Sequence, residues 1–178
     1  SLPVLSLGQE ISVTPIQVAT AFAAVANGGH LVRPHVVRGL RSQDGVLHRQ
    51  VEPVAIRRVI SAETARTLLT ILQAVVEEGT GKEAALEEYT VAGKTGTAQK
   101  LDPATGRYST RKVVASFVGA VPAEQPRLVI LVVIDDPETL RWGGSIAAPV
   151  FREIARDALK YLQVPPSPTR DVRLVRMG

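Results

Sequence analysis

The residues Lys94-Thr95-Gly96-Thr97 combine an ammonium group, two hydroxyl groups and, at Gly96, a backbone that no side chain covers. The surrounding residues predict a strand over 89–100, and strand alternation places the Thr95 and Thr97 side chains on one side. Gly96 leaves the backbone open to the close approach of an extended ligand. Such a strand edge can bind a peptide by strand addition and hold its terminal carboxylate. On their own these residues are a weak signal, because a surface turn of small residues has the same composition.

Two phosphate-binding patterns overlap this region, and neither has the context it needs. Gly93-Lys94-Thr95 resembles the end of a phosphate loop, but position 88 is Glu where that loop requires Gly, and no helix follows. Gly79-Thr80-Gly81 begins a loose dinucleotide pattern that follows a helix rather than a strand. We therefore interpret the residues at 79–81 as a helix stop and a turn.

Metal and acid–base sites receive little support. His30, His35 and His48 lack a carboxylate at ligand spacing, and the chain has no Cys. Asp135-Asp136 could do acid–base work, although a charged turn at the end of a strand is the more frequent explanation. The sequence gives no reason to expect a metal or another cofactor.

Length and composition limit the class of protein. The 178 residues are 45% hydrophobic and 21% charged, which suits one globular domain with a proper core. No apolar run approaches the roughly 20 residues that a membrane helix requires. The net charge is +4, but arginine is distributed along the chain and there are only three Tyr, three Phe and one Trp. This composition argues against nucleic-acid binding, so no nucleic-acid partner is expected.

Helices are expected before and after a group of strands. Thr14-Pro15-Ile16-Gln17 is a capping box that predicts a helix ending at Asn27, and Ser61 caps a second helix over 62–78. Asp44-Gly45 predicts a hairpin turn between Val36-Val37 and Val46-Leu47. A last helix is expected to start near Pro149 and to end before Pro165.

Three consecutive strands are expected over 89–100, 112–121 and 128–134. The run Leu128–Ile134 is apolar at every position, which predicts that both of its faces are buried. Short connections favour antiparallel neighbours. The fold class predicted is therefore α+β, an antiparallel sheet flanked by helices.

Several blocks around the Lys-Thr-Gly box carry a family resemblance, and they occur in the family's order. They are Gly8–Gln17, Ala26–Gly29, Gly79–Gly81 with Val91–Gln99, Ala115–Ala120, and Gly143–Phe151. Together they resemble the penicillin-binding transpeptidases over about residues 6–165, and most closely the monofunctional, membrane-anchored class B enzymes of cell division or elongation. The resemblance implies the C-terminal half of the serine β-lactamase/transpeptidase-like fold.

The same resemblance implies a function and assigns roles. The complete enzyme would be a peptidoglycan D,D-transpeptidase that cross-links stem peptides through a Ser acyl-enzyme and binds β-lactams. Lys94 would be catalytic, while Thr95, Gly96 and Thr97 would bind the donor carboxylate, with the Thr97 N–H as an oxyanion donor. Cell-wall synthesis or divisome proteins would be partners, at the periplasmic or extracytoplasmic face of the bacterial inner membrane.

Two motifs that this mechanism needs are not found in their places. Asn27 is the only Asn and position 25 is Val, so S-x-N is absent. Ser109 and Lys112 match S-x-x-K, but they follow the Lys-Thr-Gly box and lie between two predicted strands. The motif needs a Ser at a helix N-terminus, whereas strand geometry with an odd spacing sends the two side chains to opposite faces. We expect residues 1–165 to be the C-terminal portion of the domain and 166–178 to be a tail. The nucleophile, the first half of the domain and the membrane anchor would then precede Ser1, and the isolated chain would be inactive.

Alternatives remain open at this point. A D,D-carboxypeptidase or β-lactamase-type hydrolase uses the same Lys-Thr-Gly chemistry, and a non-catalytic penicillin-binding-like module would keep the fold without the nucleophile. The strand over 128–134 lacks an evident partner on one side. We therefore expect self-association through this open sheet edge or pairing with the missing N-terminal half.

Overall fold

The computed structural model describes residues 11–138 and 142–168. Its centre is a three-stranded antiparallel sheet in the order β5-β6-β7, formed by β5 (Ala92–Asp102), β6 (Arg107–Val121) and β7 (Leu128–Asp135). The strands follow one another in sequence as the short connections predicted, so the α+β fold class is confirmed. The predictions for residues 1–10 and for the tail beyond residue 168 lie outside the described residues.

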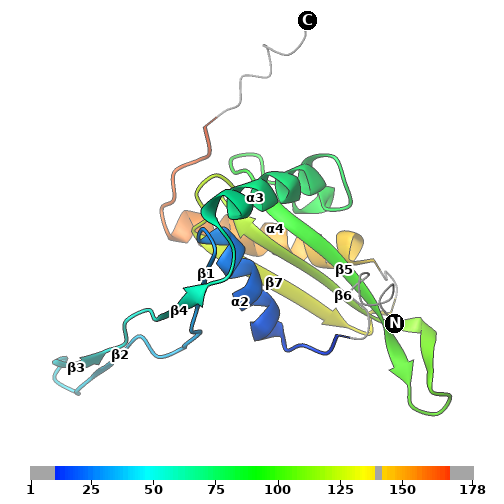
Figure 1. The fold of residues 1–178 in the computed structure, drawn as a ribbon, viewed down its shortest axis with the longest axis horizontal. Coiled ribbons are helices and arrows are strands. Elements are labelled where there is room, and N and C mark those ends of the chain that lie inside the picture. Colours follow the sequence, from blue (N-terminus) through cyan, green and yellow to red (C-terminus); the bar gives the residue numbers. More distant parts are fainter. Residues whose placement is uncertain (1–10, 139–141, 169–178) are drawn as a thin grey trace, which may run out of the picture.

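Helices cover both faces of the sheet (Figure 1). On one face lies α4 (Gly143–Tyr161), and on the other lie α2 (Pro15–Ala26) and α3 (Ala62–Glu77). The capping box is confirmed, because the Gln17 N–H donates to Thr14 Oγ1 at 3.4 Å and the Thr14 N–H donates to Gln17 Oε1 at 2.8 Å. The Ser61 cap of α3 is confirmed as well.

The core lies between the sheet and α4. Phe117 of β6 packs edge-on against Phe151 of α4, with ring centroids 4.8 Å apart, and both side chains are fully buried. Gly119 makes this packing possible, because a Cβ there would lie 2.7 Å from the Phe151 ring. Leu159 and Val121 complete the largest fully buried side chains of this layer. One face of α4 therefore packs against the sheet and contacts all three of its strands.

A two-stranded arm leaves this body. β1 (His30–Val32) pairs with β4 (Ala55–Arg58), and β2 (Gly39–Arg41) pairs with β3 (Leu47–Gln50). The predicted Asp44-Gly45 turn joins β2 to β3, although the first strand of the hairpin is Gly39–Arg41 rather than Val36-Val37. Figure 1 shows the β2–β3 end well away from the sheet.

Two expectations were wrong. The last helix begins at Gly143, six residues before Pro149, and Pro149 lies inside α4. Pro149 is the seventh residue of α4, past the first four residues whose N–H groups lack an intrahelical acceptor, so α4 does without the hydrogen bond that another residue would donate there. The residues of β7 are half-buried or exposed, and Val133 is 43% exposed, because β7 is the edge of the described sheet and not a central strand.

Candidate functional site

A pocket of about 380 Å³ opens where the N-terminus of α4 meets the edge strand β5. Strand β5 contributes Thr95 and Thr97, and α4 contributes its first residues together with the exposed indole of Trp142. The opposite wall follows α3 and comprises Thr80 and the short helix η1 (Lys82–Ala84). Three segments of the sequence, 80–83, 95–97 and 142–145, therefore meet at the strand that was predicted to carry chemistry.

Thr95 and Thr97 point toward the α4 side of the sheet. Thr95 pairs with Phe117 in the β5–β6 register, and Phe117 packs on α4, so alternation places Thr97 on that face too. The two hydroxyls were predicted to lie on one face of the strand, and both residues line the pocket.

Each hydroxyl has one partner from a distant segment. Thr95 Oγ1 lies 2.9 Å from Thr80 Oγ1, and Thr97 Oγ1 accepts a hydrogen bond of 3.1 Å from the Gly143 N–H. A hydroxyl carries one donor hydrogen and can accept two hydrogen bonds. The Thr97 hydrogen is therefore left to donate into the pocket, and the Thr80–Thr95 pair has one hydrogen left as well.

Lys94 lies on the opposite face and reaches around the free edge of β5. Its Nζ donates to the Thr95 carbonyl oxygen at 2.9 Å and approaches Thr95 Oγ1 at 3.3 Å. Lys94 is exposed and is not part of the pocket wall, so the structure brings its charge beside the hydroxyls without enclosing it. The ammonium group adds positive potential at the strand edge next to the pocket.

Small residues let α4 approach the strand closely. A Cβ at position 143 would lie 2.3 Å from the Ser116 carbonyl oxygen and 2.5 Å from the Gly96 carbonyl oxygen. A Cβ at position 96 would meet Ser116 Oγ at 2.5 Å. Gly143 thus brings the positive end of the helix dipole against the Lys-Thr-Gly strand, where an anion would be stabilised.

Sequence reasoning missed several residues of this pocket. Thr80 and Gly143 were quoted for the family resemblance without a place in the site, and Trp142 was not singled out at all. The separation of 46 residues between Thr97 and Gly143 is closed only by the tertiary fold. The pair Gly143-Gly144 is the signal that could have been used, since it starts a helix instead of forming a turn.

The S-x-x-K match takes no part in the pocket. Ser109 and Lys112 lie in β6, as expected, and Ser109 Oγ accepts the backbone N–H groups of Arg111 and Lys112 at 3.1 and 2.9 Å. Asp135 likewise lies apart from the pocket wall. It forms an ion pair of 2.8 Å with Lys100, and this hydrogen bond raises the pKa of Lys100.

The comparisons with known proteins identify the family and the fold. The family model described as the penicillin binding protein transpeptidase domain matches residues 3–156. Stage V sporulation protein D of Bacillus subtilis is 42% identical over 165 residues, which cover 90% of this chain and 25% of that protein. Peptidoglycan D,D-transpeptidase FtsI of Escherichia coli is 34% identical, with 90% of this chain and 26% of that protein covered.

A solved structure shares the fold. Penicillin binding protein 3 of Mycobacterium tuberculosis, complexed with ampicillin, superposes with a TM-score of 0.82 at 36% identity. The match covers 96% of this chain and 40% of that chain. The present chain thus spans about a quarter of the length of the curated relatives it matches. Within the described residues, no helix is both long enough and apolar enough to cross a membrane.

Proposed function

The chain belongs to the penicillin-binding protein transpeptidase family, and on that premise we propose that it supplies the donor-carboxylate subsite of a peptidoglycan D,D-transpeptidase. The observation that carries the proposal is the convergence of Thr95, Thr97 and the α4 N-terminus on one pocket, with the Lys94 ammonium beside it. Hydroxyl donors, a helix dipole and a cation together form an environment in which a carboxylate is stabilised.

The proposed reaction is acyl transfer in two steps. A Ser hydroxyl attacks the carbonyl of the penultimate D-Ala of a stem peptide, forming an ester bond and releasing the terminal D-Ala. The amine of a neighbouring stem peptide then attacks the ester, forms the cross-link and frees the Ser. This chain lacks S-x-N, and its S-x-x-K match lies in a strand, so the nucleophile is assigned to a part of the parent protein outside this chain.

The free edge of β5 is proposed to bind the extended donor peptide. This edge is proposed to present both the Thr95 carbonyl, to which Lys94 Nζ donates, and the Thr97 N–H, because residues two apart in a strand direct their backbone groups to the same side. This N–H is proposed as one donor of the oxyanion hole, where stabilisation of developing charge contributes most to acyl transfer. Lys94 is proposed to be catalytic through its charge and by orienting the Ser of the S-x-N motif.

β-Lactams are proposed as second ligands of the same subsite, since they present a carboxylate and an acylating carbonyl together. The complex of the Mycobacterium tuberculosis relative with ampicillin supports this proposal. The competing hydrolase function differs only in the acyl acceptor. Incubation of the complete protein with a donor peptide and an amine acceptor, followed by mass measurement, separates the two. Amide products support the transpeptidase, free acid alone supports the hydrolase, and failure of acylation supports a non-catalytic module.

Location and assembly follow from the proposed substrate. Peptidoglycan stem peptides lie outside the cytoplasm, so the active protein is placed at the extracytoplasmic face of the inner membrane, with cell-wall synthesis or divisome proteins as partners. The unpaired edge of β7 is proposed to pair with the N-terminal half of the domain in the complete protein. Self-association through this edge is proposed for the chain in isolation.

A further inference from the structure

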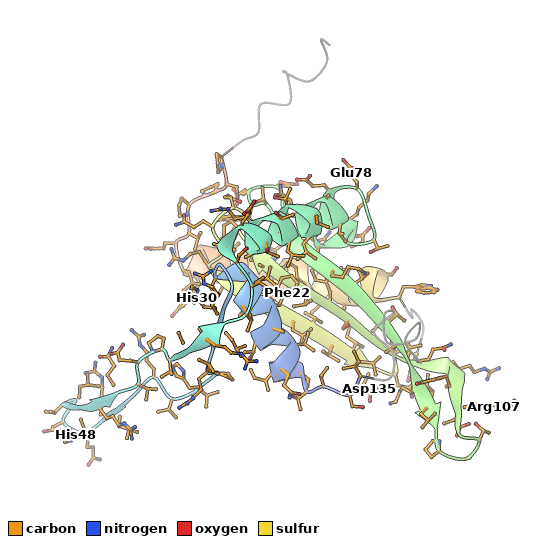
Figure 2. All side chains as sticks on the ribbon, viewed as in Figure 1. Phe22, His30, His48, Glu78, Arg107 and Asp135 are labelled. Carbon is orange, nitrogen blue, oxygen red and sulfur yellow. The ribbon has the colours of Figure 1, made fainter. Side chains whose placement is uncertain are left out.

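The segment of residues 30–58, here called the arm, is one long two-stranded ribbon that no third strand of the described chain joins. The β1–β4 and β2–β3 ladders are separated by Pro34 and Pro53, but two backbone hydrogen bonds bridge the interruption. The Arg33 N–H donates to the Val54 carbonyl at 2.9 Å, and the Val51 N–H donates to the Arg38 carbonyl at 3.0 Å. Figure 2 shows His30 near the body and His48 at the far end of the arm.

The arm holds the whole net charge of the protein. Residues 30–58 contain six Arg and no Lys against one Asp and one Glu, a net charge of +4 that equals the net charge of the full chain. Arginine is distributed along the sequence, but the acidic residues that balance it lie almost entirely outside the arm. Among the described residues, no ion pair includes an arm arginine. This positive charge is therefore presented to solvent uncompensated.

The arm also exposes aliphatic side chains to solvent. Val36 is fully exposed, and Leu40 and Leu47 are 54% and 44% exposed. All four residues of β3 are exposed, and so are all four residues of β4. An isolated two-stranded ribbon is marginally stable in water, and a third strand or a helix normally covers its apolar face. The combination points to a partner that supplies both apolar contact and negative charge.

The composition of the arm favours a protein partner over a membrane. Protein interfaces are enriched in Arg and depleted in Lys, and the arm has only Arg. Membrane-surface segments usually insert aromatic side chains at the lipid interface, and the arm has no Phe, Tyr or Trp. A second copy of the arm is disfavoured because it carries the same charge.

We propose that an acidic, extended segment of a partner protein adds to the free edge of β3 as a third strand. Leu47 and Arg49 lie on one face of β3 by alternation, and Leu40 pairs with Arg49 across the ribbon. A partner strand with alternating acidic and apolar residues would place its carboxylates on the face that carries Arg49 and Arg38, and its apolar side chains on the opposite face of the ribbon. This proposal is independent of the function proposed for the Lys-Thr-Gly pocket.

Two labelled peptides test the charge and the strand pattern directly. One alternates Glu and Val over eight residues, and the other replaces every Glu by Lys. Titration with the wild-type chain, followed by fluorescence anisotropy, is expected to show the Glu peptide binding at least about tenfold more tightly, with a loss of affinity at high salt. Amide exchange within Leu47–Gln50 is expected to slow when the Glu peptide is bound.

Charge reversals locate the surface. The double variant R38E/R49E is expected to weaken binding of the Glu peptide by at least about tenfold. The matched variant R107E/R111E, on the exposed β5–β6 hairpin, is expected to remain within about twofold of the wild type. Equal binding of the two peptides, or an equal loss in both variants, would overturn the proposal. Binding of the chain to vesicles with anionic phospholipid, without binding of the Glu peptide, would replace the protein segment by a membrane surface.

Discussion

Thr97 makes two kinds of interaction from one hydroxyl. Its oxygen accepts the Gly143 N–H, and its hydrogen is free to donate into the pocket. In the complete protein, Thr97→Val is expected to slow acylation by a fluorescent penicillin at least about tenfold, because it removes a donor from the proposed carboxylate site. Stability is expected to fall by only about 1 kcal/mol, the net value of one hydrogen bond.

Thr97→Ser serves as the control for that substitution, since it keeps the hydroxyl and removes only a methyl group. It is expected to retain most of the acylation rate and of the melting temperature. An unchanged rate in Thr97→Val would remove Thr97 from the carboxylate site. An equal loss of rate in both variants would indicate that the shape of the side chain at position 97, and not its hydrogen bond, determines the rate.

Gly143 is the residue on which the position of α4 depends. In Gly143→Ala the new Cβ would lie 2.3 Å and 2.5 Å from the carbonyl oxygens of Ser116 and Gly96, so the helix N-terminus must move away from β5. We expect a loss of about 1–3 kcal/mol in the free energy of unfolding, typical of overpacking, and slower acylation. Ser145→Ala, two residues along and exposed, is expected to leave the melting temperature unchanged. A wild-type melting temperature in Gly143→Ala would contradict the close packing.

At the scale of elements, local signals were the most reliable. The capping box at Thr14 and the Ser61 cap predicted two helix starts because the hydrogen bonds that define them span three residues. The start of α4 was missed since Pro149 resembled a first-turn proline, and Trp142 supplies no side-chain cap to mark the true beginning. The β1–β4 pairing continues the ribbon whose turn is Asp44-Gly45, but Pro34 and Pro53 interrupt the strand pattern between the two ladders, so the predicted hairpin stopped short of it.

In the candidate site, too, local signals were predicted correctly and contacts between distant elements were not. Thr95 and Thr97 were predicted to share a face because alternation within one strand is local. Thr80 and Gly143 come from other elements, and nothing in the sequence near the strand indicates that their hydrogen bonds reach it. Sequence therefore identified the strand that carries the pocket, and the fold identified the helices that complete it.

The edge of β7 leads to a prediction at this scale. Among the residues that the structure describes, its eight residues pair only with β6, and its apolar side chains are half-buried or exposed. An unpaired apolar edge associates readily with other strands, so the isolated chain is expected to self-associate at high concentration. Light scattering measures the mass, and hydrogen exchange shows whether amides in 128–134 are protected. A monomer with unprotected amides in this strand would contradict the prediction.

At the scale of the whole molecule, the residues proposed to bind the substrate lie in this chain, but the motifs of the nucleophile are not found in their places. The chain holds the proposed carboxylate subsite and one oxyanion donor, whereas the S-x-N motif is absent from the sequence. Ser109 accepts two backbone N–H groups in β6, and neither partner atom is a base that could remove its proton. A Ser hydroxyl without such a base is a poor nucleophile at neutral pH.

The 178-residue chain alone is therefore expected not to be acylated by penicillin. Charge from Lys94 and the oxyanion donor lower the barrier only when an attacking oxygen is present, so the subsite can bind a β-lactam without opening it. Intact-mass measurement after incubation with a labelled β-lactam is expected to show the unmodified mass, and a stoichiometric adduct would contradict the assignment. An adduct mapped to Ser109 would also overturn the interpretation of the S-x-x-K match. Addition of the N-terminal half of a family domain, in excess, is expected to restore labelling on the Ser of that half. That half is proposed to pair with the edge of β7 and to bring the nucleophile beside the Lys-Thr-Gly strand.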